Sequence, residues 1–418
     1  MNSPASDPRQ RRPGAWASFL AVCAAVVLVL PVAVLPLTTA VPPLVWVPLL
    51  AVGLALIVWM IARRRRRWAR PLALGLVAAV AAAAVGASQL FAATPPISGP
   101  DGEPLPGSIA SLEQVTLNGS EQWITIRGRD TTNPVLLNLG MGGPGGGGFA
   151  TRTLFEPLEE HFTVVSWDEP GTGRSYGAVP VDQLTRQRFV DDAAALATLV
   201  RDRFGQDRIY LYGVSWTSIL GIWLVQEHPD LFHAFVSSGQ MVNTVENDQM
   251  GYGIALEHLD AQGETARADR LRSNGPPPYH GDGVVFRYVA YLDVLNEIMG
   301  EPRLSLIVPV VPFLAPEYGL VDKVNHTRGL IDSFNAVYPQ LEGLDFVEQA
   351  ATLEVPVYFF VGRDDVNAMA SLVEEYHATL TAPHKELIWL DGGHGLSGET
   401  RDQFVDVMVN RVARTAGR

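Results

Sequence analysis

The chain has 418 residues, 47% of them hydrophobic, and a formal net charge of −13 at pH 7. That charge is unevenly divided, because residues 1–96 hold nine arginines and one acid, Asp7, which leaves 22 basic and 43 acidic residues elsewhere, a net −21. The acidic body excludes nucleic acid as an expected partner, since phosphates need a basic surface. The single cysteine, Cys23, excludes a disulfide within the chain.

Three apolar runs fill the N-terminal quarter of the chain, at about 15–37, 44–62 and 71–93. Each approaches the ~20 residues that a helix needs to cross a bilayer, and none contains a charge. The sequence therefore predicts an N-terminal membrane anchor, residues 1–96, with three spanning helices. The competing interpretation, a cleaved signal peptide ending near LTTA, fits less well, because the first run is long and two further spans follow.

The arginines predict the orientation of the anchor, because positive loops stay in the cytoplasm. Arg9, Arg11 and Arg12 precede the first span, and RRRRRWAR separates the second from the third. Both basic segments can be cytoplasmic only if the three spans alternate, which puts the acidic body outside the cytoplasm. A proline- and glycine-rich linker, residues 97–113, is expected between the anchor and the body.

Strands and helices alternate through the body. QWITIRG, PVLLNLG, FTVVSWD, RIYLYGV and AFVSSGQ read as strands, and LTRQRFVDDAAALATLVRDRFG as an amphipathic helix. Residues 241–346 form a helix-rich stretch, after which VPVYFFVG and KELIWLDGG resume the strand pattern. The pattern predicts an α/β fold: a core of residues 114–240 and 347–418, built on a mostly parallel sheet with helices on both faces, and an inserted helical cap, 241–346.

Function in an open parallel sheet gathers beyond the carboxyl ends of the strands. The first such loop, GMGGPGGGG, leaves backbone N–H groups free to point at an anion; no Gly-Lys-Ser/Thr follows, as a phosphate loop would require. The second is YLYGVSWTS, where Ser215 follows a strand and begins a helix, the context of a nucleophile elbow. A serine at this place is also a common helix N-cap.

Two later strands end on further candidate residues. VGRDDVNA carries Asp364 and Asp365, which fit either an acid that orients a histidine or a helix cap, and LDGGHGLSG carries His394 in a glycine-rich turn. The chain order Ser215, Asp365, His394 is that of the α/β-hydrolase arrangement and differs from the orders of chymotrypsin-like and subtilisin-like proteases.

With these motifs, the body resembles the prolyl iminopeptidase group of α/β-hydrolases over about residues 114–414. MGGPG corresponds to the family's H-G-G-P-G oxyanion motif, WDEPGTGRS to W-D-Q-R-G-x-G-x-S, GVSWTS to the G-G-S-W-G-S elbow, and GRDD to G-R-x-D, which selects Asp365 over Asp364. DGGH resembles G-x-G-H, with Asp391 in place of the first glycine. The helical insertion corresponds to the family's cap.

Further departures from the family pattern are Met141 for the histidine, Pro170 for the arginine and Thr217 for the second elbow glycine. The first two alter support around the oxyanion loop and put strict proline specificity in doubt. Thr217 is bulkier and β-branched, so it is expected to tighten the elbow or shift its packing.

The resemblance implies a serine hydrolase with Ser215, His394 and Asp365 as its triad. It also implies an oxyanion hole from the backbone N–H groups of Gly143 and Trp216, with no metal or organic cofactor. Aminopeptidases of this family bind the substrate's free amine with cap acids, and Glu246 in NTVEND is the candidate.

Three functions are open from the sequence. They are a membrane-anchored aminopeptidase, an esterase or amidase acting on small acyl compounds, and an inactive hydrolase fold used as a binding module. The expected partners are a small peptide or acyl substrate and the lipid bilayer; the sequence does not indicate an oligomeric state.

Overall fold

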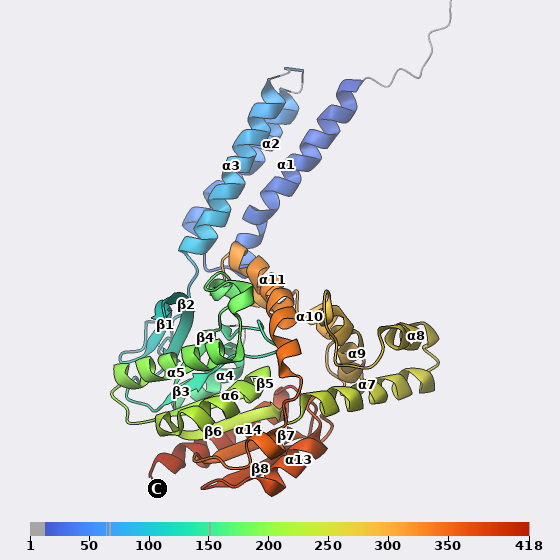
Figure 1. The fold of residues 1–418 in the computed structure, drawn as a ribbon. Coiled ribbons are helices and arrows are strands. Elements are labelled where there is room, and N and C mark those ends of the chain that lie inside the picture. The colour runs from blue at the N-terminus through green and yellow to red at the C-terminus, as the bar shows by residue number, and fades with distance from the viewer. Residues whose placement is uncertain (1–12, 64, 67, 150–151, 418) are drawn as a thin grey trace, which may run out of the picture. The chain divides into compact units, whose positions relative to one another are not determined.

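The structure is a computed structural model that describes residues 13–63, 65–66, 68–149 and 152–417 (Figure 1). It contains two compact units, Met1–Ala93 with Pro316–Val321 and Thr94–Ala315 with Asp322–Arg418. Several arginines of the orientation argument lie outside the described residues: Arg9, Arg11, Arg12, Arg64 and Arg67.

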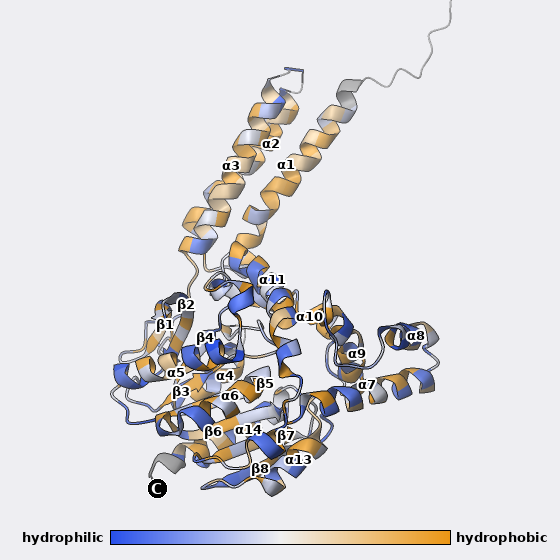
Figure 2. Cartoon of the chain, viewed as in Figure 1, coloured by the Kyte–Doolittle hydropathy of each residue, from blue (hydrophilic) through white to orange (hydrophobic). Residues whose placement is uncertain are grey.

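Three apolar helices make up most of the first unit: α1 (Pro13–Thr38), α2 (Pro43–Ala62) and α3 (Ala69–Leu90). All three are long and apolar enough to cross a membrane, and Figure 2 shows them mostly in hydrophobic colours. Small side chains lie where they meet, because Ala25 and Ala73 are fully buried. Three apolar helices are therefore found where the sequence predicts the spans, the third ending at Leu90 instead of residue 93.

The second unit contains one eight-stranded sheet in the order β1-β2-β4-β3-β5-β6-β7-β8. β1, β2 and β4 pair antiparallel, and every later pairing is parallel. This mostly parallel sheet confirms the predicted fold class. The strands are β1 (Ile109–Leu117), β2 (Ser120–Gly128), β3 (Val135–Asn138), β4 (Thr163–Asp168), β5 (Ile209–Ser215), β6 (Phe232–Gln240), β7 (Val357–Gly362) and β8 (Lys385–Leu390).

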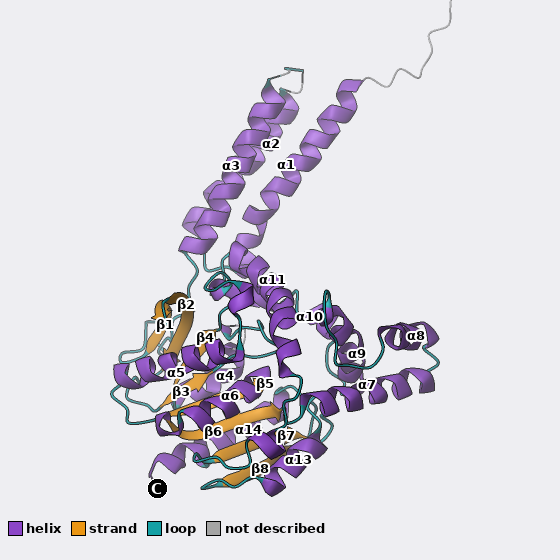
Figure 3. Ribbon diagram, viewed as in Figure 1, coloured by secondary structure: helices purple, strands orange, loops and turns teal. Residues whose placement is uncertain are grey.

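Both faces of the sheet are covered by helices (Figure 3). Neighbouring residues of one strand point to opposite faces, so Leu211 packs with α5 and α6, whereas Tyr210 packs with α14. The parallel strands are buried on both faces for this reason and read as continuous apolar runs. The covering helices are α4 (Arg152–Phe155), α5 (Arg186–Arg203), α6 (Trp216–Glu227), α13 (Ala370–Thr379) and α14 (Gly398–Asn410).

The β1–β2 hairpin corrects the expected linker, because β1 begins at Ile109, inside the range 97–113. Asn118 and Gly119 form its two-residue turn with φ of 46° and 82°, the positive values that a type I′ turn requires. An Asn-Gly turn closes a tight hairpin, so nine residue pairs of β1 and β2 fall into register.

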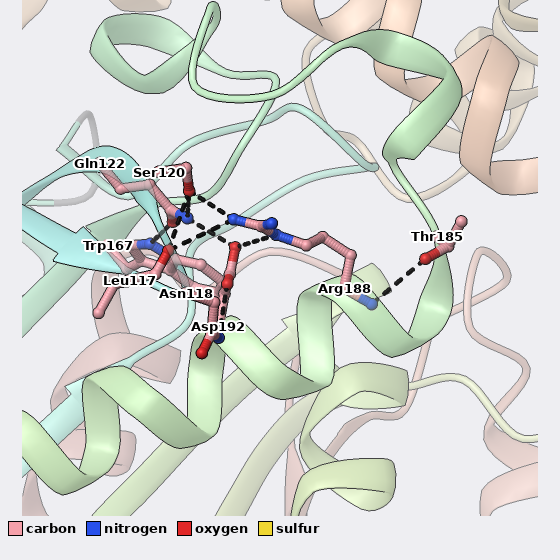
Figure 4. A network of polar contacts seen from close by, with 8 residues as sticks. All are labelled: Leu117, Asn118, Ser120, Gln122, Trp167, Thr185, Arg188 and Asp192. Carbon is pink, nitrogen blue, oxygen red and sulfur yellow. Dashed lines mark hydrogen bonds and ion pairs between the residues drawn. The ribbon is translucent and has the colours of Figure 1, made fainter.

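A buried acid on α5 holds this hairpin against the sheet (Figure 4). Asp192 is fully buried and accepts hydrogen bonds from Gln122 Nε2 at 2.6 Å and Asn118 Nδ2 at 2.9 Å. Arg188, one turn earlier on α5, forms an ion pair with it at 2.7 Å. One carboxylate therefore satisfies donors from the hairpin and from its own helix.

The chain between β6 and β7 contains helices and loops in the described structure, in the range expected for the cap. An aromatic cluster that includes Tyr252, Tyr288 and Tyr291 forms its core. Its helices are α7 (Thr244–Ala261), α8 (Thr265–Asn274), α9 (Val284–Ile298), α10 (Leu304–Ile307), α11 (Leu320–Val337) and α12 (Phe346–Gln349).

Replacing the buried acid should destabilise the hairpin. Asp192→Ala removes the buried acceptor shared by Gln122, Asn118 and the guanidinium of Arg188, which is expected to cost about 3 kcal/mol of unfolding free energy. The measurement is the melting temperature of the detergent-solubilised chain, with Asp191→Ala as control, because Asp191 is exposed on the same helix. Equal melting temperatures for the two variants would contradict this role.

Candidate active site

Ser215 occupies a strained turn between β5 and α6. Its φ of 55° and ψ of −122° lie in a region that residues other than glycine rarely adopt, and α6 begins at the next residue. The turn is possible because Gly213 has no side chain: a Cβ atom there would lie 2.3 Å from the carbonyl oxygen of Thr217. This is the strand-turn-helix context predicted for a nucleophile elbow.

Asp365 and His394 are brought together from the ends of β7 and β8. His394 Nδ1 lies 2.9 Å from Asp365 Oδ2, and the side chain of Asp365 is almost fully buried. Its other oxygen accepts hydrogen bonds from the backbone N–H groups of Asn367 and Ala368, at 2.9 and 2.8 Å. Asp364 is exposed, so of the two adjacent acids only Asp365 is fixed against the histidine.

The environment of His394 favours its charged form. Burial alone would lower the pKa of this imidazole, but the charge and hydrogen bond of Asp365, together with the charge of Glu301, raise the pKa above its ordinary value. Glu301 belongs to the cap and also accepts a hydrogen bond from the N–H of Gly395 at 2.8 Å. The cap thus holds the loop on which His394 lies.

The backbone of β6 connects this pair with Ser215. A Cβ atom on Gly239 would lie 2.5 Å from His394 Cε1, so the imidazole rests on Gly239. In the sheet Ser215 pairs with Gln240, the residue after Gly239. Among the hydrogen bonds of the described residues none joins Ser215 to His394; such bonds are often long without substrate and tighten when it binds.

Two backbone N–H groups near the elbow are free to donate. Trp216 is the first residue of α6, so its N–H has no carbonyl partner in the first helical turn. Within the described part of the chain, the N–H of Gly143 in the glycine loop also donates no hydrogen bond. These are the two donors that the sequence predicts for the oxyanion hole.

Thr217 ties the elbow to the glycine loop. Its Oγ1 accepts a hydrogen bond from the N–H of Val214 at 2.8 Å and lies 3.0 Å from the carbonyl oxygens of Gly140 and Val214, either of which can accept its proton. The hydroxyl group of Thr217 therefore connects the end of β5 with the start of the glycine loop.

Two acids at the end of β4, Asp168 and Glu169, hold the rest of the loop. Glu169 Oε1 accepts a hydrogen bond from the N–H of Gly145 at 2.7 Å, and its Oε2 accepts one from the indole N–H of Trp216 at 3.1 Å. Asp168 accepts one from the N–H of Gly148 at 3.2 Å. Glu169 stands where the family signature has glutamine, a difference that the sequence analysis did not use.

Glu169 is buried beside the two elements that carry the predicted oxyanion donors, the glycine loop and the start of α6. Burial raises the pKa of its carboxyl group to about 7, against the lowering effect of its hydrogen bonds from Gly145 and Trp216. A carboxyl group with this pKa changes its charge close to neutral pH, directly behind the glycine loop.

The predicted cap acid, Glu246, lies in the first turn of α7, with its backbone N–H bonded to Asn243. It lines an open surface cleft of about 360 Å³ together with Gln249 and Asp345. Asp248, two residues later, is instead buried and accepts hydrogen bonds from Tyr338 Oη at 3.1 and 3.2 Å. Burial raises the pKa of Asp248 to about 7, although the tyrosine hydrogen bond lowers it.

Asp248 is connected with the glycine loop through two stacked rings. The ring of Tyr338 stacks on that of Phe334 at 4.5 Å, and a Cβ atom on Gly143 would lie 2.8 Å from Phe334 Cδ2. Asn247, the residue before Asp248, donates through Nδ2 to the carbonyl oxygen of Asn367, in the loop that carries Asp365. Glu246 is exposed and Asp248 is buried, a difference that the polar sequence NTVEND at the start of α7 does not indicate.

The described residues contain no group of three or more histidines, cysteines and acids that could hold a metal ion. The polar groups around Ser215 are a histidine, a carboxylate and free backbone N–H groups. This set is suited to nucleophilic attack on a carbonyl carbon and to the stabilisation of the resulting oxyanion.

Known proteins resemble this chain over its body. The sequence model of the family described as alpha/beta hydrolase fold matches residues 133–274. "Probable aminopeptidase YbaC" of Bacillus subtilis is 29% identical over 286 residues, 66% of this chain and 88% of that protein. "Putative carbamate hydrolase RutD" of Pantoea ananatis is 34% identical over 286 residues, 68% of this chain and 89% of that protein.

Solved structures show the same fold. A proline iminopeptidase from Mycobacterium smegmatis superimposes with a TM-score of 0.53 at 17% sequence identity, over 74% of this chain and all of the other. A proline iminopeptidase-related protein from Thermus thermophilus superimposes with a TM-score of 0.50 at 18% identity, over 74% and 98% of the two chains.

Glu169 should make stability depend on pH. Its pKa rises from an ordinary 4.5 to about 7 on folding, so the folded chain gains stability below about pH 5 and loses about 3 kcal/mol of it as pH rises through 7. Glu169→Gln keeps an acceptor oxygen and removes this titration. The melting temperature of the variant minus that of the wild type should increase by several degrees between pH 5 and pH 8; a constant difference would contradict the burial argument.

Proposed function

The chain belongs to the α/β-hydrolase family, and we propose that it is a membrane-anchored serine hydrolase, specifically an aminopeptidase that releases N-terminal residues. The observation that carries the proposal is the strained backbone of Ser215. In the sheet Ser215 pairs with Gln240, and the residue before Gln240, Gly239, contacts the imidazole of His394. That imidazole in turn lies against Asp365. Strain of this kind persists where the surroundings impose it, and it is concentrated at functional sites.

In the proposed mechanism His394 Nε2 takes the proton of Ser215 Oγ as that oxygen attacks the substrate carbonyl carbon. Asp365 keeps the proton of the imidazole on Nδ1 and stabilises the cation that forms, which agrees with the raised pKa of His394. The intermediate then expels the leaving amine, which receives the proton from His394. Water, deprotonated by the same imidazole, releases the acyl group from Ser215.

The N–H groups of Gly143 and Trp216 would bind the oxyanion of each tetrahedral intermediate. Donors that are already fixed before the reaction stabilise the developing charge without reorganisation. Support comes from the hydrogen bonds that Glu169 accepts on both sides of this hole, from Gly145 in the loop and from the indole of Trp216.

The preference for a substrate with a free amine rests on the cap. Asp248 supplies a buried carboxyl group, and Phe334 links its surroundings with Gly143. The hydroxyl of Tyr291 lies in the same aromatic cluster and interacts with Asp248, whose pKa it lowers. A substrate ammonium group would pair with the ionised carboxylate, and the relative from Bacillus subtilis is itself named as an aminopeptidase.

An esterase or amidase acting on small acyl compounds is the second candidate, because the same triad hydrolyses esters. The relative named as a carbamate hydrolase favours it. We further propose that the body lies outside the cytoplasm, on the argument from the arginines that flank the spans.

Ser215→Ala should abolish both covalent labelling and hydrolysis, because the nucleophile is lost. A membrane-impermeant fluorophosphonate probe should label the wild type on intact cells, and a panel of aminoacyl arylamides and acyl esters should be hydrolysed at least ~1,000-fold faster by the wild type. Ser273→Ala, an exposed serine on α8, is the control and should keep full labelling.

Each failure of this experiment has a separate meaning. No labelling in detergent would leave the binding-module interpretation in place of an enzyme. Labelling only after the cells are permeabilised would refute the proposed orientation. Hydrolysis of esters without arylamides would replace the aminopeptidase by the esterase.

Two substitutions test whether Asp248 or Glu246 binds the substrate amine. Asp248→Asn should lower kcat/KM for aminoacyl arylamides by about 10- to 100-fold through a higher KM, since a charged hydrogen bond contributes about 1.5–3 kcal/mol, and should leave acyl esters nearly unaffected. The wild type should bind the amine better as pH rises through 7, because Asp248 then becomes ionised. Glu246→Gln is the matched control; a loss confined to that variant would return the assignment to Glu246.

A further inference from the structure

A stretch of the cap exposes apolar side chains without any charge among them. Residues 304–315, LSLIVPVVPFLA, contain one polar side chain, Ser305. Leu306, Val310 and Leu314 have 67%, 53% and 73% of their surface exposed. Uncharged stretches of about 10–14 residues are too short to span a bilayer and are typical of buried or interfacial segments. Within this one only Pro312 and Ala315 are buried.

The backbone of the stretch is held from inside. Ser305 donates through its N–H to Asp293 of α9 at 3.0 Å. Lys323 of α11 is almost fully buried, and its Nζ donates to the carbonyl oxygens of Pro312 and Ala315 at 2.8 Å each. These hydrogen bonds connect the backbone of the stretch with α9 and α11 of the cap, and the exposed apolar side chains lie on the surface of the cap.

The residues that follow, Pro316–Val321, belong to the same compact unit as the three apolar helices. Leu320 donates through its N–H to Ser88 Oγ at 2.9 Å, and the N–H of Ala93 donates to Pro316 at 3.4 Å. The side chain of Leu320 packs against residues near the ends of these helices: Val32, Leu35, Val41, Ala84 and Ala87.

These contacts lie where α1 ends, α2 begins and α3 ends, so all of them would lie at one face of a bilayer that the helices span. Leu314 is two residues from Pro316, so covalent geometry keeps their Cα atoms within about 7 Å. The polar layer of a bilayer adds about 5–8 Å on each side of the hydrocarbon. The exposed stretch therefore starts within reach of that layer.

We propose that residues 304–315 insert their exposed apolar side chains into the boundary between headgroups and acyl chains of the bilayer that holds α1–α3. The occupant of this surface is lipid, because the chain passes directly from it to a segment packed on the membrane helices. Burying these side chains in the interface is favourable in proportion to their apolar area. The proposal requires that the three helices span the bilayer and is independent of catalysis by Ser215.

The contact also has a connection to the active site. Glu301, three residues before the stretch, accepts the hydrogen bond from Gly395, which follows His394. The segment of the cap that contains Glu301 thus continues directly into the stretch that we propose to contact lipid.

A fluorescent reporter in reconstituted vesicles tests the proposal. In a Cys23→Ala background, Leu314→Cys is labelled in detergent with an environment-sensitive dye, and the full chain is reconstituted into phosphatidylcholine vesicles that contain a lipid with its nitroxide near the headgroup. The dye should be quenched roughly two-fold or more relative to a dye at Ser273→Cys, an exposed polar position on α8. Val310→Cys is the second reporter if Leu314→Cys lowers the melting temperature.

The native Cys23 is the control for insertion. It is exposed on α1, near the middle of the helix, so a dye there should be quenched by a nitroxide deep in the bilayer. With Cys23 quenched, a dye at position 314 that is accessible to aqueous iodide would overturn the proposal. Protection from both iodide and lipid, as a protein contact would give, would also overturn it. If a dye at Cys23 is not quenched, α1 does not enter the bilayer, and the proposal, which requires spanning helices, is overturned.

Discussion

The positive φ of Ser215 is the constraint on which the rest of the site depends. A non-glycine residue keeps such a backbone only when its surroundings leave no alternative. Gly213 allows the turn to close on Thr217, whose hydroxyl then binds the backbone at Val214 and Gly140. The elbow and the glycine loop are thereby fixed to each other before any substrate arrives, and Trp216 begins its helix with a free N–H.

Buried carboxylates extend this fixed arrangement outwards. Glu169 accepts hydrogen bonds from the glycine loop and from the indole of Trp216, and Asp365 accepts two from its own loop while it faces His394. Hydrogen bonds to charged acceptors are strong in a low dielectric, but an unpaired buried charge is costly. Asp365 has a cationic partner available in His394, whereas Glu169 receives only neutral donors, so burial raises the pKa of Glu169.

The sequence predicted those parts of the molecule whose signals are local. Buried strands read as apolar runs, and the residues at their ends gave the order Ser215, Asp365, His394, two of which the structure joins by a hydrogen bond. The start of the β1–β2 hairpin lies inside the predicted linker. Its Asn118–Gly119 turn is a local signal for a hairpin, but the proline-rich composition before β1 favours a linker. Glu169 could not be found in this way, since its role arises from strands and loops that meet only in the folded chain.

The proposed lipid contact connects the exposed apolar residues of the cap with the three apolar helices. In water, exposed Leu306 and Leu314 are unfavourable, because apolar surface costs about 25 cal/mol per Å². At a bilayer the same side chains would lower the free energy, and helices that cross it would keep the local lipid concentration high, so that a weak interfacial contact would be occupied most of the time. The buried Lys323 supports this reading, because it holds the backbone of the stretch so that ordering its apolar side chains in lipid costs little further entropy.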